Sequence, residues 1–119
     1  MSLKVTAREV GNVVVLDLSG RITLGEGSGT VRSTIKDLSE KGKRNILVNL
    51  GDVSYIDSAG LGELIGGYAS VTNQGGNIKL LHLQKKVRDL LQVTKLYSIF
   101  EAFDDEAAAV ASFGQAAKA

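Results

Sequence analysis

Ser58 is the residue whose type and position offer the most chemistry in this chain. It follows Asp57 and lies between the apolar pair Tyr55-Ile56 and the small pair Ala59-Gly60. A buried-strand pattern ends upstream and a helical pattern begins downstream, so Ser58 falls where a strand leads into a helix. Free backbone N–H groups and the positive end of the helix dipole favour phosphate or carboxylate at such a point. The hydroxyl can therefore be a helix cap, a nucleophile or a phosphate acceptor.

The nucleophile is the weakest of these three interpretations. A hydrolase elbow has the pattern Gly-x-Ser-x-Gly, and the chain supplies only the second glycine, Gly60. His82 is the only histidine and so the only general base of the usual kind, while Asp57 adjoins the serine instead of being placed to orient that histidine. His82 is more simply interpreted as a strand residue at a polar edge. The absence of cysteine excludes thiol catalysis and thiolate metal sites.

A glycine-rich run, residues 25–29, suggests a nucleotide site because it lies between a predicted strand and a predicted helix. It lacks the Gly-Lys-Ser/Thr ending of a phosphate-binding loop. Aligning Gly25 and Gly27 with the dinucleotide fingerprint places Thr30 where the third glycine belongs. A flexible loop is therefore the favoured interpretation, and a small nucleotide-binding or nucleotide-hydrolysing domain remains the alternative function class.

From the residues alone, Asp57 and Ser58 are most simply a capping pair, because Asp and Ser are preferred helix N-caps. Phosphorylation of Ser58 is the competing hypothesis. It would add about −1.5 to −2 charges beside Asp57, which a domain can tolerate at an exposed helix start but which would repel a docked partner.

Hydrophobic periodicity predicts the elements that position Ser58. Residues 3–8 alternate as a half-buried strand, Gly11-Asn12 suits a hairpin turn, and residues 13–18 and 45–50 read as buried strands. A break is expected at residues 20–23. Helices are predicted from Val31 to a stop at Gly42, from Leu61 to Gly75-Gly76 and around residues 87–94. An alanine-rich closing helix is predicted to carry the acidic residues 104–106 at its first turn. Further strands are predicted at residues 78–81 and, at an edge, 99–103.

The predicted helix after Ser58 has an apolar face and many glycines. Its face is expected to comprise Leu61, Leu64, Ile65, Tyr68 and Thr72. Each interior glycine costs up to about 1 kcal/mol against alanine. The glycines at positions 60, 62, 66 and 67 therefore indicate a close approach of this helix to a strand or a partner.

The element order predicts one α/β domain spanning residues 1–119. Strands alternating with helices require right-handed crossovers, so we expect a mixed, mostly parallel sheet of four to five strands with an N-terminal hairpin and about four helices. The strand exits near residues 20, 50 and 82 should lie along one edge. Arg21, Ile22, Ser58 and His82 are therefore expected to share a surface.

Composition excludes several function classes. The 119 residues carry 14 Lys and Arg against 13 Asp and Glu, a net charge of +1, which argues against a nucleic-acid surface. Aromatic residues make up 5% and Trp is absent, so base-stacking platforms are not expected. No apolar run approaches the roughly 20 residues of a membrane span, and no signal-peptide pattern begins the chain. We expect a cytoplasmic protein without cofactor or metal, and leave its oligomeric state open.

The stretch 56–62, Ile-Asp-Ser-Ala-Gly-Leu-Gly, strongly resembles the signature of STAS domains, specifically the bacterial anti-sigma factor antagonists. The resemblance covers almost the whole chain. Residues 13–22 resemble the family's second strand and its Gly-Arg-Leu/Ile turn, and residues 46–50 resemble the strand before the signature. Residues 75–80 resemble the Gly-Gly-x-Leu strand entry, and residues 87–100 resemble the third helix and its exit.

The resemblance implies a non-enzymatic phospho-switch. In that family the unphosphorylated antagonist binds an anti-sigma factor, often a serine kinase, and so frees a sigma factor. The kinase phosphorylates the signature serine, here Ser58, and a metal-dependent serine phosphatase reverses this. The expected docking surface comprises Arg21, Ile22, Tyr55, Asp57, Ser58, Leu61 and Gly62. A constitutive STAS adaptor in a signalling or lipid-transport complex, with Ser58 only a cap, is a further alternative.

Overall fold

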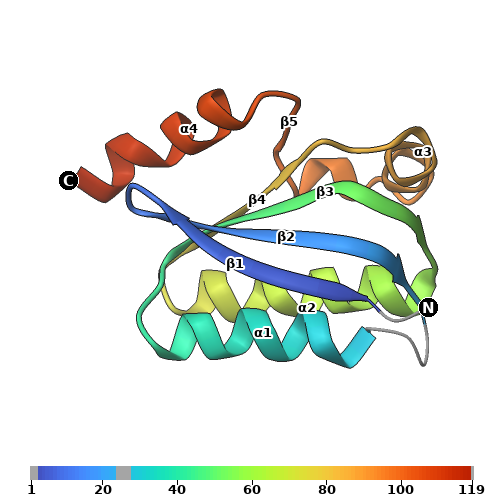
Figure 1. Cartoon of the computed structure of the whole chain (residues 1–119), viewed down its shortest axis with the longest axis horizontal. Helices are drawn as coiled ribbons and strands as arrows, with labels where there is room; N and C mark the ends of the chain where they lie inside the picture. Colours follow the sequence, from blue (N-terminus) through green and yellow to red (C-terminus); the bar gives the residue numbers. More distant parts are fainter. Residues whose placement is uncertain (1–2, 24–27, 119) are drawn as a thin grey trace.

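The computed structural model describes residues 3–23 and 28–118 and shows an α/β domain built on one five-stranded sheet (Figure 1). The strands follow one another in space in chain order, with β1 antiparallel to β2 and every other pair parallel. The elements are β1 Lys4–Val10, β2 Val13–Ile22, α1 Ser28–Glu40, β3 Asn45–Ile56, α2 Ser58–Asn73, β4 Asn77–Leu81, α3 Lys85–Val93, the short 3-10 helix η1 Leu96–Ser98, β5 Ala102–Phe103 and α4 Glu106–Lys118. The predicted fold class is confirmed.

The two central strands are longer than the sequence predicted. The break expected at residues 20–23 is wrong, because β2 continues to Ile22, and β3 continues six residues beyond its predicted end at Leu50. The two strands support each other over this extension, up to the Ile22–Ile56 pair, with two register shifts on the way. Gly20 adopts a φ of 121° next to one of these shifts, a conformation open to glycine, so the bulge bends the strand without ending it.

Alternating side chains give the sheet a buried face on each side. The larger cluster joins Leu16, Val48 and Leu80 of the strands to Ile35 of α1 and Leu64 of α2. The smaller cluster joins the opposite faces of the same strands to Ala109 and Phe113 of α4. Figure 1 shows α1 and α2 side by side below the sheet, with α4 on the other side. This sandwich explains why residues 13–16 and 46–48 are buried almost without alternation.

Helix α2 packs closely on the sheet, and its glycines allow this. Its buried residues are Gly60, Leu61, Leu64, Gly67 and Val71. The expected face was therefore partly wrong, because Thr72 is exposed and Ile65 is 36% exposed. A Cβ on Gly60 would overlap the backbone carbonyl of Ile22, and one on Gly67 would lie 2.6 Å from the Ile35 side chain. The close approach that the glycines predicted is confirmed at these two positions.

The C-terminal part follows the predicted order with shorter elements. The edge strand expected over residues 99–103 is shorter than predicted. It comprises only β5, and η1 precedes it in the chain. Glu106 lies in the first turn of α4, as expected, and Asp105 accepts a hydrogen bond from the Ala108 N–H at 2.8 Å. Most of the glycine-rich run 25–29 lies outside the described residues. No helix in the described part of the chain is long and apolar enough to cross a membrane.

Candidate functional site

The first turn of α2 is built around Asp57. This residue has extended backbone angles, and its side chain accepts a hydrogen bond from the Gly60 N–H at 2.8 Å. Its own N–H donates to the Ile22 carbonyl at 3.2 Å, which ties the helix start to the end of β2. Asp57 is thus the N-cap, and the capping pair inferred from the sequence resolves into one capping residue.

Ser58 is the first residue of α2 and is exposed. Within residues 3–23 and 28–118, its hydroxyl makes no hydrogen bond. The interpretation of Ser58 as the cap is therefore wrong, because the Asp57 carboxylate already occupies that position. An exposed hydroxyl without a structural bond is accessible to a modifying enzyme at little structural cost.

The end of β2 lies directly beside this helix start. Arg21 pairs with Tyr55 in the register of the parallel strands, and the Arg21 guanidinium lies 5.3 Å from the centre of the Tyr55 ring. Both side chains are exposed, Tyr55 to 42%. An exposed cation–π pair of this kind contributes about 0.5–1 kcal/mol and holds the two side chains together.

The predicted docking residues differ in exposure, and Asp57, the N-cap, is half-buried. Ile22 and Leu61 are 0% and 6% exposed and belong to the larger core cluster, so their side chains position the surface from beneath. Gly62 is exposed, and a Cβ there would meet nothing within 4 Å. Ile65, one helical turn after Leu61, is exposed as well. Among the residues that the structure describes, the exposed surface around Ser58 includes Arg21, Tyr55, Gly62 and Ile65.

His82 does not share this surface. It follows β4, whose pairing with β3 ends at the Leu81–Asn49 pair, and its Cβ lies near Gly51. From Asn49, β3 continues for seven more residues to Ile56, just before Asp57 and Ser58. Seven residues span about 20 Å at the rise of a strand. The carboxyl ends of the parallel strands β2, β3 and β4 point to one edge as expected, but β3 runs on well past β4, so the expectation that His82 shares a surface with Ser58 is wrong. The hydrolase interpretation loses its only base.

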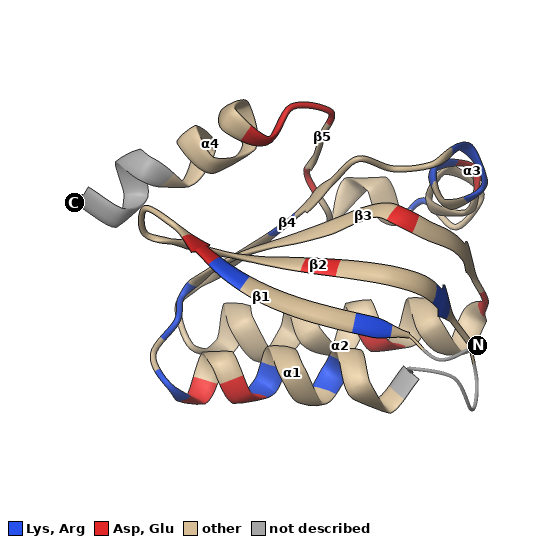
Figure 2. Cartoon of the chain, in the orientation of Figure 1, with Lys and Arg blue, Asp and Glu red and all other residues tan. Residues whose placement is uncertain are grey.

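A charged network lies on the α4 side of the sheet. Arg8 donates to Asp17 at 2.6 Å and to Glu106 at 2.6 Å, and Asn49 donates to Asp17 at 2.8 Å. The hydrogen bonds from Arg8 hold the pKa of both carboxyl groups below their usual range, and the carboxylates raise the pKa of Arg8. These contacts join β1 and β2 to the start of α4, so this network is structural. Figure 2 shows where the charged residues lie over the remainder of the fold.

A polar group that no sequence motif indicated lies at the opposite end of the sheet. Asn12, Asn45 and Asn77 lie around a hollow with Lys43 and Arg44. The sequence feature that could have indicated this group is the position of the asparagines, because each one stands at the beginning of an apolar strand. No group of three or more His, Cys, Asp or Glu that could hold a metal was found within the described residues.

Comparison with known proteins identifies relatives of the whole fold. The family model of the STAS domain matches residues 4–109. The anti-sigma-B factor antagonist of Bacillus subtilis is 31% identical over 101 residues, covering 85% of this chain and 91% of the relative. The anti-sigma F factor antagonist of Paenibacillus polymyxa is 25% identical and covers 89% of this chain and 91% of its own. Both names describe binding regulators.

Solved structures of other proteins have the same fold as this chain. The crystal structure of a Thermotoga maritima protein, provisionally assigned as an anti-sigma factor antagonist, superposes with a TM-score of 0.84 at 26% identity, covering 91% of this chain and 92% of its own. The Bacillus cell fate determinant SpoIIAA, solved in its phosphorylated form, superposes with a TM-score of 0.69 at 22% identity, covering 88% and 96%. The second likeness concerns the fold alone.

Proposed function

The chain belongs to the STAS domain family, and we propose that it is an anti-sigma factor antagonist controlled by phosphorylation of Ser58. The unphosphorylated domain binds an anti-sigma factor and so frees a sigma factor. Phosphorylation ends that interaction. Residues 1–119 act in this role as one non-enzymatic binding domain in the cytoplasm.

The observation that carries the proposal is the separation of cap and hydroxyl at the start of α2. Asp57 caps the helix, while Ser58 is exposed and makes no hydrogen bond within the described residues. A phosphate can therefore be added without displacing the bond that begins the helix. The positive end of the helix dipole favours the added charge locally, so the fold tolerates both states.

The phosphate acts on the partner by charge and bulk. Ser58 lies within an exposed surface that includes Tyr55, Gly62 and Ile65, residues a partner can cover closely. A group carrying about −1.5 to −2 charges in the middle of such a contact would need to be desolvated on binding. Loss of affinity thus requires no rearrangement of the domain.

The enzymes of the cycle are part of the proposal. The anti-sigma factor is a serine kinase that phosphorylates Ser58 when it binds, and a metal-dependent serine phosphatase removes the phosphate. One solved relative of this fold is a phosphorylated form. The family name and the exposed signature serine support a corresponding state of this chain.

The direct test is isothermal titration calorimetry of this domain against candidate anti-sigma kinases encoded in the same genome. Ser58→Ala should bind like the unmodified domain, and Ser58→Asp should bind about 5- to 150-fold more weakly, equivalent to roughly 1–3 kcal/mol. Glu63→Gln provides a nearby charge change on α2 that leaves the serine intact.

Equal affinities of Ser58→Ala and Ser58→Asp would favour a constitutive adaptor. Phosphopeptide mapping of the protein from its own cells is the second readout. Condition-dependent phosphate on Ser58 supports the switch, and its consistent absence with good peptide coverage contradicts it.

A further inference from the structure

A polar hollow lies at the end of the domain opposite Ser58. Its volume is about 360 Å³, and its lining residues are Asn12, Gly42, Lys43, Arg44, Asn45, Gly75 and Asn77. They come from the β1–β2 turn, from the loops that end α1 and α2, and from the first residues of β3 and β4. Ser58 begins α2 and Gly75 follows its end, so the length of the helix, about 24 Å, separates the two places.

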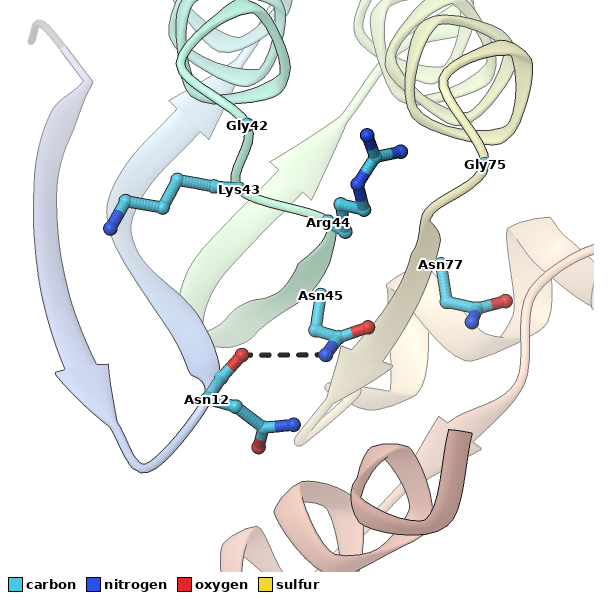
Figure 3. A pocket seen from close by; sticks show the side chains of 7 residues that line it. All are labelled: Asn12, Gly42, Lys43, Arg44, Asn45, Gly75 and Asn77. Carbon is cyan, nitrogen blue, oxygen red and sulfur yellow. Dashed lines mark hydrogen bonds between the residues drawn. The ribbon is translucent and has the colours of Figure 1, made fainter. Parts of the chain in front are cut away.

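Three asparagines line the hollow at the starts of neighbouring strands. Figure 3 shows Asn12, Asn45 and Asn77 at the starts of neighbouring strands, while the Lys43 side chain extends toward β1 and the Arg44 side chain toward the end of α2. Asn45 and Asn77 are register partners, and Asn45 is only 9% exposed. The Asn45 amide donates to the Asn12 carbonyl at 3.4 Å, whereas the side chains of Asn12 and Asn77 make no hydrogen bond to any described residue. Donors and acceptors therefore remain available among the residues that line the hollow.

Both ionised groups that line the hollow are cations. Arg44 donates from Nη1 to the Gln74 carbonyl, and Lys43 pairs with Glu9 at 3.1 Å. Each contact uses one of several N–H donors on its side chain. Glu9 itself lies outside the hollow and lines a smaller one of about 120 Å³ that adjoins Lys43 along the hairpin. No carboxylate lines the 360 Å³ hollow within the described residues.

The backbone keeps this space open. Gly42 and Gly75 end α1 and α2 with φ of 84° and 82°, a conformation that side chains rarely adopt. A Cβ on Gly75 would lie 3.2 Å from Arg44 Nη1, and one on Gly42 would meet nothing within 4 Å. The two turns therefore frame the hollow without filling it.

We propose that this hollow binds a small oxyanion through Lys43, Arg44 and the three asparagines. Its volume is at the lower end of the range of about 300–1,000 Å³ typical of ligand sites. Cations and amide N–H groups complement phosphate or carboxylate oxygens. The described lining residues include no large apolar side chain, so an apolar ligand is not expected. The inference is independent of the Ser58 switch.

The test is a two-dimensional NMR titration of the intact domain with sodium phosphate and with citrate, at constant ionic strength held by sodium chloride. Saturable shifts confined to the amides around Asn12, Lys43, Asn45 and Asn77 are expected. Such shifts with phosphate alone would indicate a phosphate site, with citrate alone a carboxylate site, and with both a general oxyanion site. Each of these results supports the proposal. Shifts that do not saturate, or that are spread over all basic residues, would overturn it.

Charge variants sharpen the test because they should act in opposite directions. Lys43→Gln and Arg44→Gln should each weaken binding about fivefold, and Glu9→Gln should strengthen it by releasing Lys43. Lys4→Gln and Asp52→Asn make the same charge changes away from the hollow and should have no effect. Equal effects of these controls would show a non-specific response to net charge. Ser58→Asp should bind the anion as the unmodified domain does.

Discussion

At the scale of single residues, Asp57 and Ser58 are neighbours with separate tasks. The carboxylate of Asp57 satisfies the Gly60 N–H, and the exposed hydroxyl of Ser58 satisfies no group within the described residues. Because the cap is on Asp57 and the Ser58 hydroxyl bonds to no described residue, Ser58 can be modified without loss of the helix start.

This division predicts unequal stability effects. Asp57→Ala should lower the free energy of unfolding by about 1 kcal/mol because an N-terminal N–H loses its acceptor. Ser58→Ala should change it by less than about 0.5 kcal/mol. Urea unfolding followed by circular dichroism measures both. A cost for Ser58→Ala equal to that of Asp57→Ala would show that the hydroxyl is structural after all.

At the scale of elements, the position of α2 depends on the backbone contact between Gly60 and the end of β2. A side chain at Gly60 would overlap the Ile22 carbonyl, which also accepts the hydrogen bond from Asp57. The same small residue thus permits close packing and places Ser58 beside Arg21 and Tyr55.

Gly60→Ala should therefore destabilise the domain by about 3 kcal/mol or more, since backbone cannot move aside as a flexible side chain can. Gly62→Ala is the matched control. Its Cβ would enter open space, so the better helix former should stabilise by up to about 1 kcal/mol. Thermal unfolding of the two variants would compare them directly. Equal shifts of the unfolding midpoint for Gly60→Ala and Gly62→Ala would contradict the close packing of Gly60 on Ile22.

At the scale of the whole molecule, Arg8 joins the first strand to the last helix. It binds Asp17 and Glu106, and the Arg8 and Glu106 side chains are 39% and 34% exposed. Solvent screening reduces the strength of such partly exposed pairs, so we expect the network to contribute about 1–2 kcal/mol at neutral pH.

The lowered pKa values of Asp17 and Glu106 fix the sign of the pH dependence. Carboxyl groups with a folded-state pKa below the unfolded value stabilise at higher pH, and this stability is lost as the pH falls through the folded-state pKa. Arg8→Gln should be less stable at neutral pH, and its difference from the unmodified domain should shrink below about pH 4.

Urea unfolding at several pH values tests this expectation. Lys85→Gln removes a pair with Asp89 whose side chains are 87% and 53% exposed, and it should have almost no effect. A difference between Arg8→Gln and the unmodified domain that stays constant into acid would exclude the two carboxylates as its source.

Local patterns determined much of the fold from the sequence alone. Apolar alternation and the Gly11-Asn12 turn predicted the hairpin, and strand–helix alternation predicted the parallel sheet, because burial and backbone geometry act over a few residues. The signature around Ser58 predicted the family that the domain model confirms. The roles of the individual docking residues stay predictions.

Only the tertiary structure decided how far each strand runs and which side chains meet. The extension of β3 past Leu50 depends on its pairing with β2 and separates His82 from Ser58. The choice of Asp57 over Ser58 as cap depends on backbone angles at one residue. The asparagines at positions 12, 45 and 77 line one hollow because β2, β3 and β4 begin at the same edge of the sheet. Such long-range geometry leaves no periodic pattern in the sequence, since the contacts join residues far apart in the chain.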